Sequence, residues 1–151
     1  MSLLKIQKYS DSFRQQLLSV WEASVLATHH FLKPEDFLSI KEAVTTIDFT
    51  AFDVYCMTRN SMLVGFVGLA ERKVEMLFVS PDCFRQGIGG KLMDFAIRDL
   101  KANQVDVNEQ NSDAVRFYSK LGFVVYERTG TDDQGKNYPL LRMKLPAETV
   151  L

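Results

Sequence analysis

Cysteine is scarce in this sequence: it occurs only as Cys56 and Cys83, without a CxxC pair or a cysteine–histidine cluster. This scarcity excludes a disulfide framework and gives no sign of a zinc site, so we expect no bound metal. Cys56 lies in an apolar run and is expected to be buried and structural. Cys83 lies in a polar segment, where we expect it to be incidental.

The sequence also lacks long apolar runs and an excess of charge of either sign. No stretch approaches the roughly 18 apolar residues that span a bilayer. The segment Met1–Lys5 lacks the basic flank and apolar core of a signal peptide. The 18 basic and 19 acidic residues give a formal net charge of −1, which offers no broad attraction to nucleic acid or anionic lipid. We therefore expect a cytoplasmic protein with neither nucleic acid nor membrane as a partner.

Internal repeats and low-complexity linkers are absent as well, which predicts a single domain over residues 1–151. A chain of 151 residues buries roughly 70 % of its unfolded surface and folds without metals or disulfides. Its 46% hydrophobic and 25% charged residues are ordinary for a globular protein and argue against disorder. These features limit the class of protein but name no function.

Hydrophobic periodicity predicts strands and helices in the order β-α-α-β-β-β-α-β-α-β-β. The strands are expected at residues 3–9, 53–58, 62–70, 74–79, 104–107, 123–128 and 138–145. The helices are expected at residues 13–28, 34–47, 88–101 and 111–120. Three consecutive strands before a helix indicate a mixed α/β or α+β sheet and argue against a doubly wound nucleotide-binding fold.

The stretch from Leu77 to Leu92 carries the clearest chemistry, because a predicted strand runs into a glycine-containing loop that opens a helix. Glycines let backbone N–H groups approach a ligand, and the positive end of a helix favours an anion such as phosphate. A kinase-type P-loop is excluded, because Arg85 stands five residues before Gly90, where that motif needs glycine. A dinucleotide fingerprint fails too, because its third glycine is missing. A turn that binds no ligand remains an alternative.

The same loop resembles the pyrophosphate-binding loop of the GNAT superfamily of N-acetyltransferases, whose signature is Arg/Gln-x-x-Gly-x-Gly/Ala. Gly87 and Gly89 match the two glycines of the signature. Phe84 stands in the Arg/Gln position, which is a departure, and Arg85 follows one position late. That departure affects the first contact of a side chain with the pyrophosphate, but not the contacts that the backbone amides of the loop would make.

A second motif follows at the spacing that the family expects. The segment Asn111–Phe123 is similar to the superfamily element Asn-x-x-Ala-x-x-Phe-Tyr-x-x-x-Gly-Phe. An amphipathic helix with Asn111 as its N-cap and Gly122 as its C-cap also accounts for the segment. An amphipathic helix alone does not explain why the glycine loop and this second motif occur in the order that the family shows, with a strand between them.

The resemblance implies an α/β (α+β) fold: a GNAT-like single domain with a mixed, mostly antiparallel seven-stranded sheet. Helices would lie on both faces, and the sheet would splay between its fourth and fifth strands. Segments 27–29, 107–111 and 132–141 further resemble a small bacterial subgroup of uncharacterised acetyltransferases. The implied activity is transfer of an acetyl group from acetyl-CoA, a co-substrate, to a primary amine that attacks directly. A non-catalytic acyl-CoA-binding regulatory module is the alternative.

The resemblance also implies which residues bind acetyl-CoA: the end of a strand, the glycine loop and the start of a helix would do so. They are Leu77, Phe78, Val79, Arg85, Gln86, Gly87, Ile88, Gly89, Gly90, Lys91, Asn108 and Asn111. Backbone N–H groups near Leu77 or Val79 would polarise the thioester carbonyl. For Asn108, a hydrogen bond to the pantetheine arm and a local turn are both open interpretations.

Tyr118 is the expected general acid, because CoA leaves as a thiolate and a nearby phenol hydroxyl can donate a proton to it. Its alternative is a buried tyrosine with a structural hydrogen bond. Cys83 is not expected to carry the acyl group, because the acceptor amine itself attacks and this cysteine lies at the pyrophosphate end.

Glu75 is the expected general base, since an amine nucleophile must first lose a proton. Strand alternation places Glu75, Leu77 and Val79 on one face, and Val74, Met76 and Phe78 on the other. An exposed edge position, or an ion pair with Lys73 or Arg72, is the alternative for Glu75. Glu22 is a second candidate for the base.

The acceptor side is expected to include His29, His30 and Tyr138. Either histidine can bind substrate, act as a base, or stabilise the end of the first helix as a cation. Tyr138 can face the acceptor, or begin the last strand after a turn at Gly135. The identity of the acceptor amine, and whether the protein is a monomer or a homodimer, stay open at this point.

Overall fold

The computed structural model describes residues 3–147, and its helices and strands follow the predicted order. The strands are β1 (Leu4–Lys8), β2 (Asp53–Arg59), β3 (Met62–Ala70), β4 (Lys73–Val79), β5 (Gln104–Asn108), β6 (Val124–Thr129) and β7 (Leu140–Lys144). The helices are α1 (Arg14–Thr28), α2 (Pro34–Val44), α3 (Ile88–Arg98) and α4 (Ser112–Lys120). Short 3-10 turns are η1 (Asp11–Phe13), η2 (Phe49–Ala51) and η3 (Pro81–Cys83).

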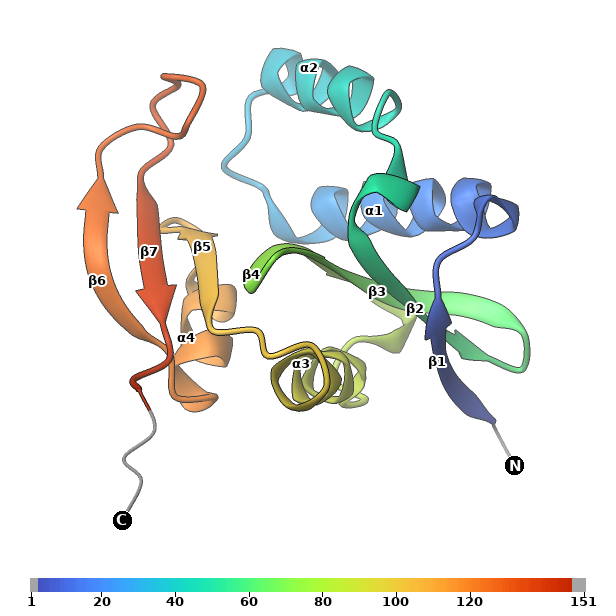
Figure 1. The fold of residues 1–151 in the computed structure, drawn as a ribbon. Helices are drawn as coiled ribbons and strands as arrows, with labels where there is room; N and C mark the ends of the chain where they lie inside the picture. The colour runs from blue at the N-terminus through green and yellow to red at the C-terminus, as the bar shows by residue number, and fades with distance from the viewer. Residues whose placement is uncertain (1–2, 148–151) are drawn as a thin grey trace.

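The strands form one seven-stranded sheet in the order β1-β2-β3-β4-β5-β7-β6. Every neighbouring pair is antiparallel except β4 and β5, which are parallel. The parallel pairing covers only Lys73 with Gln104 and Val74 with Val105. Beyond these residues β4 and β5 diverge, so the sheet opens between its fourth and fifth strands (Figure 1). The predicted fold and its splay are confirmed.

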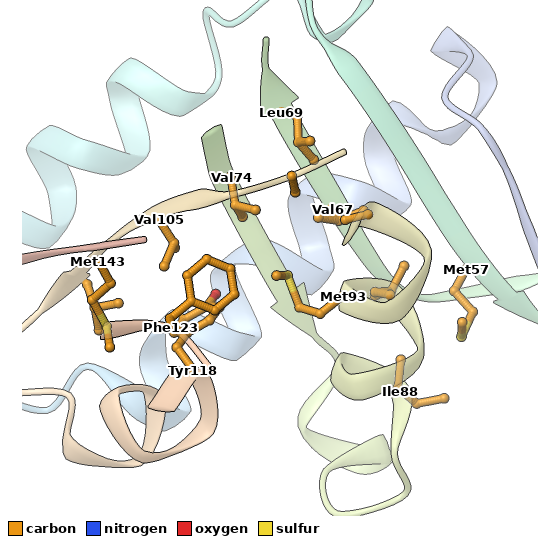
Figure 2. Close-up of a cluster of buried hydrophobic side chains, with 14 of the residues drawn as sticks. Met57, Val67, Leu69, Val74, Ile88, Met93, Val105, Tyr118, Phe123 and Met143 are labelled. Atoms are coloured by element: carbon orange, nitrogen blue, oxygen red, sulfur yellow. The ribbon is translucent and has the colours of Figure 1, made fainter. Parts of the chain in front are cut away.

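Two helices cover each face of the sheet, and a hydrophobic core lies under each pair (Figure 1). The core against α3 and α4 includes Leu92, Met93 and Phe123 and is drawn in Figure 2. The core against α1 and α2 includes Leu17 and Trp21. Both cores use side chains from β2 and β3, because successive residues of a strand point to opposite faces. The central strands therefore join the two halves of the protein.

Local sequence signals explain several boundaries of these elements. Pro34 occupies the first turn of α2, where its fixed φ and missing N–H cost nothing. Asn60 and Ser61 have φ values of 51° and 72°, which suit the tight turn that joins β2 to β3. Gly122, with a φ of 102°, follows the end of α4 in the left-handed region that favours glycine.

Both cysteines are buried and free. Burial of Cys56 is as predicted, and it raises the pKa of that thiol to about 12. Cys83 lies in η3, is only 8% exposed and belongs to the core against α3 and α4. The expectation that it is incidental stays a prediction. Across residues 3–147, none of the helices is both long and apolar enough to cross a bilayer. The same residues contain no group of three His, Cys, Asp or Glu side chains suited to a metal ion.

Candidate active site

The glycine loop joins the end of β4 to the start of α3. After Val79, the N–H of Ser80 still donates to the carbonyl of Val64 on β3 (2.8 Å), and η3 then turns the chain away from the sheet. Gly87 is the N-cap of α3 and has a φ of 80°, a conformation that glycine adopts without strain. Arg85 also has a positive φ, 64°, which strains a residue with a Cβ atom. The loop is therefore held in an uncommon backbone conformation.

This conformation leaves a row of backbone donors without acceptors. Within residues 3–147, none of the N–H groups from Arg85 to Gly90 donates a hydrogen bond, and the first to do so is that of Lys91, to Gly87 (3.0 Å). Free N–H groups at the positive end of a helix form an anion site. A Cβ atom at Gly87 or at Gly90 would meet no atom within 4 Å, so no other described part of the chain packs closely at these two positions. The arrangement suits the phosphates of CoA.

The side chains of the loop contribute unequally to this site. Arg85 and Lys91 are exposed, so their cations can add to the amide cradle. The Gln86 side chain is engaged within the protein: its Oε1 accepts from Arg59 Nη1 (2.7 Å) and its Nε2 donates to the Asp82 carbonyl (3.2 Å). Gln86 can therefore offer a ligand its backbone N–H but not its side-chain amide.

The edge of β4 next to the loop supplies further unpaired N–H groups. Because Ser80 donates to β3, alternation along the strand directs the N–H groups of Leu77 and Val79 away from β3, toward β5. Pairing with β5 ends at Val74, so these two groups face the opening in the sheet. The N–H of Phe78 points to β3 instead. Of the three predicted residues on β4, Leu77 and Val79 thus have free backbone donors.

Tyr118 lies on α4 beside this opening, among the aromatic rings of the core (Figure 2). It is 7% exposed, and its ring packs edge-on against Phe117 and Phe123, with centroids 5.1 and 5.8 Å away. The ring of Phe117 also lies 3.6 Å from the position that a Cβ on Gly89 would take, so α4 meets the start of α3. Burial raises the pKa of Tyr118, so its hydroxyl keeps its proton at neutral pH. No residue from 3 to 147 hydrogen-bonds that hydroxyl.

Asn108 and Asn111 lie between β5 and α4. Asn111 is the predicted N-cap, because its Oδ1 accepts from the N–H of Ala114 (3.2 Å). Asn108 ends β5, and its Oδ1 accepts from the N–H of Gln110 (3.0 Å), which is the local turn considered above. The structure thus shows a structural role for both side chains. Their contact with CoA stays a prediction.

Glu75 occupies an irregular position in β4. Gly68 pairs with Met76 and Leu69 pairs with Val74, so Glu75 is an extra residue, a β-bulge. The bulge interrupts the alternation, and Val74 therefore packs in the same core as Leu77 and Val79. The expectation that Val74 lies on the opposite face from Leu77 is wrong for this reason.

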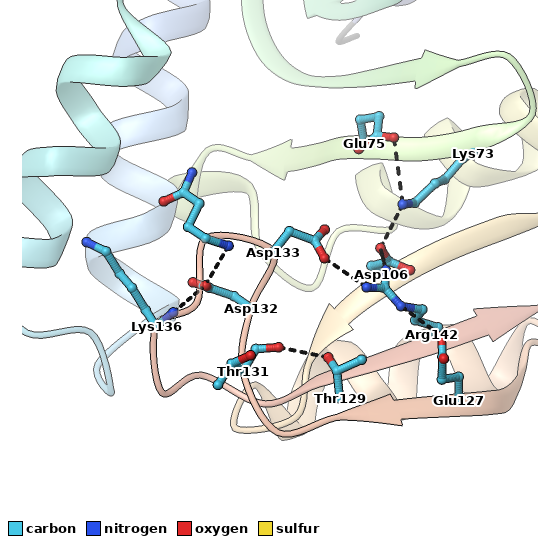
Figure 3. Close-up of polar contacts among 11 residues, drawn as sticks. Lys73, Glu75, Asp106, Glu127, Thr129, Thr131, Asp132, Asp133, Lys136 and Arg142 are labelled. Atoms are coloured by element: carbon cyan, nitrogen blue, oxygen red, sulfur yellow. Dashed lines mark hydrogen bonds and ion pairs between the residues drawn. The ribbon is translucent and has the colours of Figure 1, made fainter.

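The side chain of Glu75 is 41% exposed, and its carboxylate lies 3.9 Å from Lys73 Nζ (Figure 3). The nearer partner of Lys73 is Asp106 on β5, at 2.7 Å, and Asp106 also accepts from Arg142 on β7 (2.7 Å). The ion pair of Glu75 with Lys73 is the structural alternative considered above, and it leaves the carboxylate accessible. The second candidate, Glu22, forms an ion pair with Lys41 at 2.9 Å.

The predicted acceptor histidines lie at the end of α1. His29 follows the helix as its C-cap, and its Nδ1 shares a hydrogen bond with Thr28 Oγ1 (2.8 Å). Burial, and then the neighbouring His30, lowers the pKa of His29, so the ring is not the helix-capping cation considered above. His29 and the exposed His30 line a pocket of about 370 Å³ between α1 and α2. The other lining residues are Val25, Leu26, Leu32, Pro34, Phe37 and Leu38.

Tyr138 connects the loop between β6 and β7 to α2. Its hydroxyl donates to Asp36 Oδ2 and accepts from the N–H of Lys33 (3.1 Å). Lys136 Nζ binds the other carboxylate oxygen of Asp36 at 2.9 Å. Gly135 has a φ of 79°, as its predicted turn requires, but the last strand begins at Leu140 and not at Tyr138. Phe31 lies between His29 and Tyr138, with ring centroids 5.3 and 6.1 Å away, so the three rings form one aromatic row.

Sequence reasoning missed two groups beside this site. Asp36 and Lys136 are 100 residues apart in the chain, and no local pattern links them. Arg59 ends β2 and reaches the glycine loop, although nothing around it in the sequence marks it as part of the site. The departure at Phe84 was the available signal that another residue helps to organise this loop.

Comparisons with known proteins agree with this geometry. The sequence matches the family described as "Acetyltransferase (GNAT) domain" over residues 22–146. The peptidyl-lysine N-acetyltransferase YjaB of Salmonella typhimurium is 35% identical over 144 residues, which are 95% of this chain and 99% of that protein. The solution structure of apo-form YjaB from Escherichia coli has a TM-score of 0.87 at 31% identity, covering 97% of this chain and 99% of that one.

A more distant structure shares the fold. The PaiA N-acetyltransferase of Thermoplasma acidophilum, solved in complex with coenzyme A, has a TM-score of 0.71 at 22% identity and covers 94% of this chain and 99% of that one. The family match over most of the chain and the similarity to YjaB confirm the resemblance found in the two motifs. The chain belongs to the GNAT family of acetyltransferases, enzymes that use acetyl-CoA for N-acetylation.

Proposed function

We propose that this protein transfers the acetyl group of acetyl-CoA to the ε-amino group of lysine in a protein or peptide. The observation that carries the proposal is the row of free N–H groups from Arg85 to Gly90. This row follows the end of β4, where the strand no longer pairs with β5. This arrangement suits a ligand with phosphates at one end and a carbonyl at the other. The lysine acceptor rests on the similarity to YjaB, which is named a peptidyl-lysine N-acetyltransferase.

Different residues along the opening in the sheet bind different parts of acetyl-CoA. The N–H groups of residues 85–90, with the cations of Arg85 and Lys91, hold the phosphates. The N–H groups of Leu77 and Val79 face the opening, where they can stabilise negative charge on a carbonyl oxygen. Acetyl-CoA supplies the activated thioester, and Asn108 lies at the end of β5 where its free amide nitrogen can bind the pantetheine arm.

Proton transfer from the amine is assigned to Glu75, and stabilisation of the leaving sulfur is assigned to Tyr118. Glu75 takes a proton from the lysine ammonium, directly or through a water, because only the neutral amine is a nucleophile. The amine nitrogen then bonds to the acetyl carbon, the carbon–sulfur bond breaks, and sulfur leaves with the bonding electrons. The nitrogen releases its surplus proton to water, so that the products are the neutral amide and the CoA thiolate. Tyr118 donates a hydrogen bond to that sulfur. A phenol whose pKa burial has raised holds its proton more tightly than a thiol does, so hydrogen-bond donation is favoured over full transfer.

The aromatic row and the pocket at the end of α1 form the acceptor side of this proposal. Phe31 packs against both His29 and Tyr138, and His30 is one of the residues that line the pocket. A protein acceptor would place its lysine between this wall and Glu75. The expected cytoplasmic location stays a prediction, and so does the choice between monomer and homodimer.

A turnover assay on the purified protein tests the proposal. We expect loss of the thioester absorbance of acetyl-CoA when a lysine-containing peptide is present, and mass spectrometry should place the acetyl group on the lysine side chain. The matched control is the same peptide with arginine at that position, and parallel reactions contain a peptide with only an α-amine, a polyamine or an aminoglycoside.

Each outcome of this assay is decisive. Acetylation of the polyamine or aminoglycoside, with none of the lysine peptide, would overturn the lysine assignment and keep N-acetylation. Acetyl-CoA binding without turnover of any acceptor would overturn the enzyme proposal and favour the non-catalytic acyl-CoA-binding module.

A further inference from the structure

Arg59 makes a contact with the glycine loop that the roles assigned above do not use. It is the last residue of β2, and its guanidinium reaches across to the loop between η3 and α3. Arg59 Nη1 donates to Gln86 Oε1 (2.7 Å) and lies 3.8 Å from Cys83 Sγ. Its Nε is buried and has no hydrogen-bond partner within the described part of the chain. A buried polar atom without a hydrogen-bond partner is costly, so the position of this half-buried side chain calls for an explanation.

The loop needs an outside contact to keep its conformation. Arg85 and Gly87 both have positive φ values, 64° and 80°, and they flank Gln86 on either side. The backbone N–H groups from Arg85 to Gly90 form no hydrogen bond within residues 3–147, so they do not hold the loop in place. A strained segment with free donors persists only when its surroundings fix it.

Gln86 is the point at which the surroundings fix this segment. Its side-chain amide accepts from Arg59 and donates to the Asp82 carbonyl (3.2 Å), so it joins β2 to the beginning of the loop. These two bonds hold the Gln86 side chain against the protein, within a run of N–H groups that donate to no residue from 3 to 147. Arg59 meets the loop through Gln86, and its buried Nε is not available to a phosphate in solution.

We propose that Arg59 is a positioning residue for acetyl-CoA: through Gln86 it holds residues 85–87 in the conformation that presents their N–H groups to the phosphates. The proposal rests on the assignment of this loop to CoA in the proposed function. It also accounts for the departure at Phe84, because a side chain from another strand organises a loop whose signature position is apolar. A preorganised loop binds more tightly, since less ordering accompanies binding.

The test is the affinity of purified variants for CoA, measured by titration calorimetry without an acceptor. We expect Arg59→Ala to weaken CoA binding about 10-fold, the order expected for one lost charge-assisted hydrogen bond. Arg59→Lys should recover part of the loss, because a single ammonium donor can still reach Gln86 Oε1. The matched control is Arg98→Ala, which removes the same charge from the far end of α3, where Arg98 pairs with Asp94.

A double-mutant cycle separates positioning from direct contact. If Arg59 acts through Gln86, the double variant Arg59→Ala, Gln86→Ala should bind CoA no more weakly than Gln86→Ala alone. Additive losses, together with a weaker dependence of affinity on salt, would mean that Arg59 touches a phosphate directly and would overturn the proposal. If Arg59→Ala fails to fold, the single variant Gln86→Ala still tests the proposal, because it removes the same contact at an exposed residue; unchanged CoA affinity of Gln86→Ala would overturn the proposal.

Steady-state kinetics give a second readout that general loss of structure would not reproduce. At saturating acetyl-CoA, Arg59→Ala should reach the wild-type kcat with an unchanged KM for the acceptor and a raised KM for acetyl-CoA. An equal fall of kcat at every acetyl-CoA concentration would contradict positioning. Wild-type protein that binds CoA without turnover overturns only the proposed function, whereas wild-type protein that does not bind CoA overturns the present proposal too.

Discussion

At the scale of single residues, burial separates the two groups to which proton chemistry is assigned. Tyr118 is 7% exposed, and its raised pKa keeps it protonated. The Glu75 side chain is 41% exposed and pairs with Lys73, so it stays in contact with solvent. One group can therefore donate a hydrogen bond to a leaving sulfur while the other accepts a proton from an incoming amine. The two substitutions that follow should affect the reaction differently.

Removal of the Tyr118 hydroxyl should impair the chemical step. We expect Tyr118→Phe to lower kcat about 100-fold, the order for losing one hydrogen-bond donor to a developing charge. The Kd for acetyl-CoA should stay within about 2-fold of wild type and the melting temperature should not fall, because no residue from 3 to 147 hydrogen-bonds that hydroxyl. Tyr126→Phe, at an exposed tyrosine on β6, is the matched control. An unchanged kcat in a folded Tyr118→Phe protein would end the assignment.

Removal of the Glu75 charge should change the pH dependence of the reaction. If this carboxylate is the general base, Glu75→Gln should lose the ascending limb of kcat/KM that wild type shows as pH rises. Measurement of initial rates across pH, with acetyl-CoA saturating, checks this expectation. Glu127→Gln is the matched control, because Glu127 is an exposed carboxylate that pairs with Arg142 (3.1 Å) in the same polar network. A Glu75→Gln profile that keeps the wild-type limb excludes Glu75 as the base.

At the scale of secondary structure, two polar contacts bridge the opening between β4 and β5. Near its closed end Lys73 pairs with Asp106, which joins β4 to β5. The second contact joins α2 to the loop between β6 and β7: Asp36 on α2 binds Tyr138 and Lys136 of that loop. The loop joins β6 to β7, which lie with β5 on one side of the splay. Helix α2 packs over β2, β3 and β4 on the other side (Figure 1). The Asp36 contacts thus hold α2 and the loop between β6 and β7 together.

The Asp36 contacts should make stability depend on pH at the acid end. Hydrogen bonds from Tyr138 first, and then from Lys136, hold the pKa of Asp36 below its usual 3.8. A carboxyl with a lowered pKa stabilises the folded state above its unfolded pKa, and that stability is lost as pH falls through the folded value. Wild type should therefore be more stable than Asp36→Asn at neutral pH. The difference should shrink as pH falls below 3.8.

Urea unfolding at a series of pH values measures that difference. Tyr138→Phe keeps the carboxylate and Lys136 but loses the larger of the two hydrogen-bond effects. Its unfolding should therefore lack most of the pH dependence that Asp36→Asn removes. A constant gap between wild type and Asp36→Asn from neutral to acid pH would show that these contacts do not stabilise the folded state.

At the scale of the whole molecule, one sheet joins two hydrophobic cores. Trp21, the only tryptophan, lies in the core against α1 and α2, where it stacks on Phe37 at 6.0 Å. Phe123 lies in the other core and is 2% exposed. Because strands β2 and β3 contribute side chains to both cores, loss of one core should release the other. Tryptophan fluorescence can therefore report on a substitution that does not touch Trp21.

We expect Phe123→Ala to lower the free energy of unfolding by about 3–5 kcal/mol, the range for removing a buried aromatic ring. The unfolding curves from Trp21 fluorescence and from far-ultraviolet circular dichroism should shift together, as in a two-state transition. Leu121→Ala, at a partly buried residue of the same core, should shift both curves less. A Trp21 transition that stays at the wild-type midpoint would show that the two cores unfold independently.

Much of the fold followed from signals that act within a few residues. The order of strands and helices, the turn at Asn60 and Ser61, the cap by Asn111 and the left-handed Gly122 were all predictable, because local backbone preferences decide them. The glycine loop was found in the same way. The predicted end of α3 at Lys101 was wrong: no glycine marks the boundary, yet the helix ends at Arg98 and Lys101 has a φ of 62°.

The sequence by itself determined the family, the element order and the glycine loop that opens α3, since each depends on neighbouring residues. Tertiary structure decided the β-bulge at Glu75, because the register of β4 is set by its pairing with β3. It also decided the contact of Arg59 with Gln86, 27 residues away, and that of Asp36 with Tyr138, 102 residues away. Such contacts follow from how the packed sheet brings distant segments together, and side-chain preferences within a short segment carry no record of that packing.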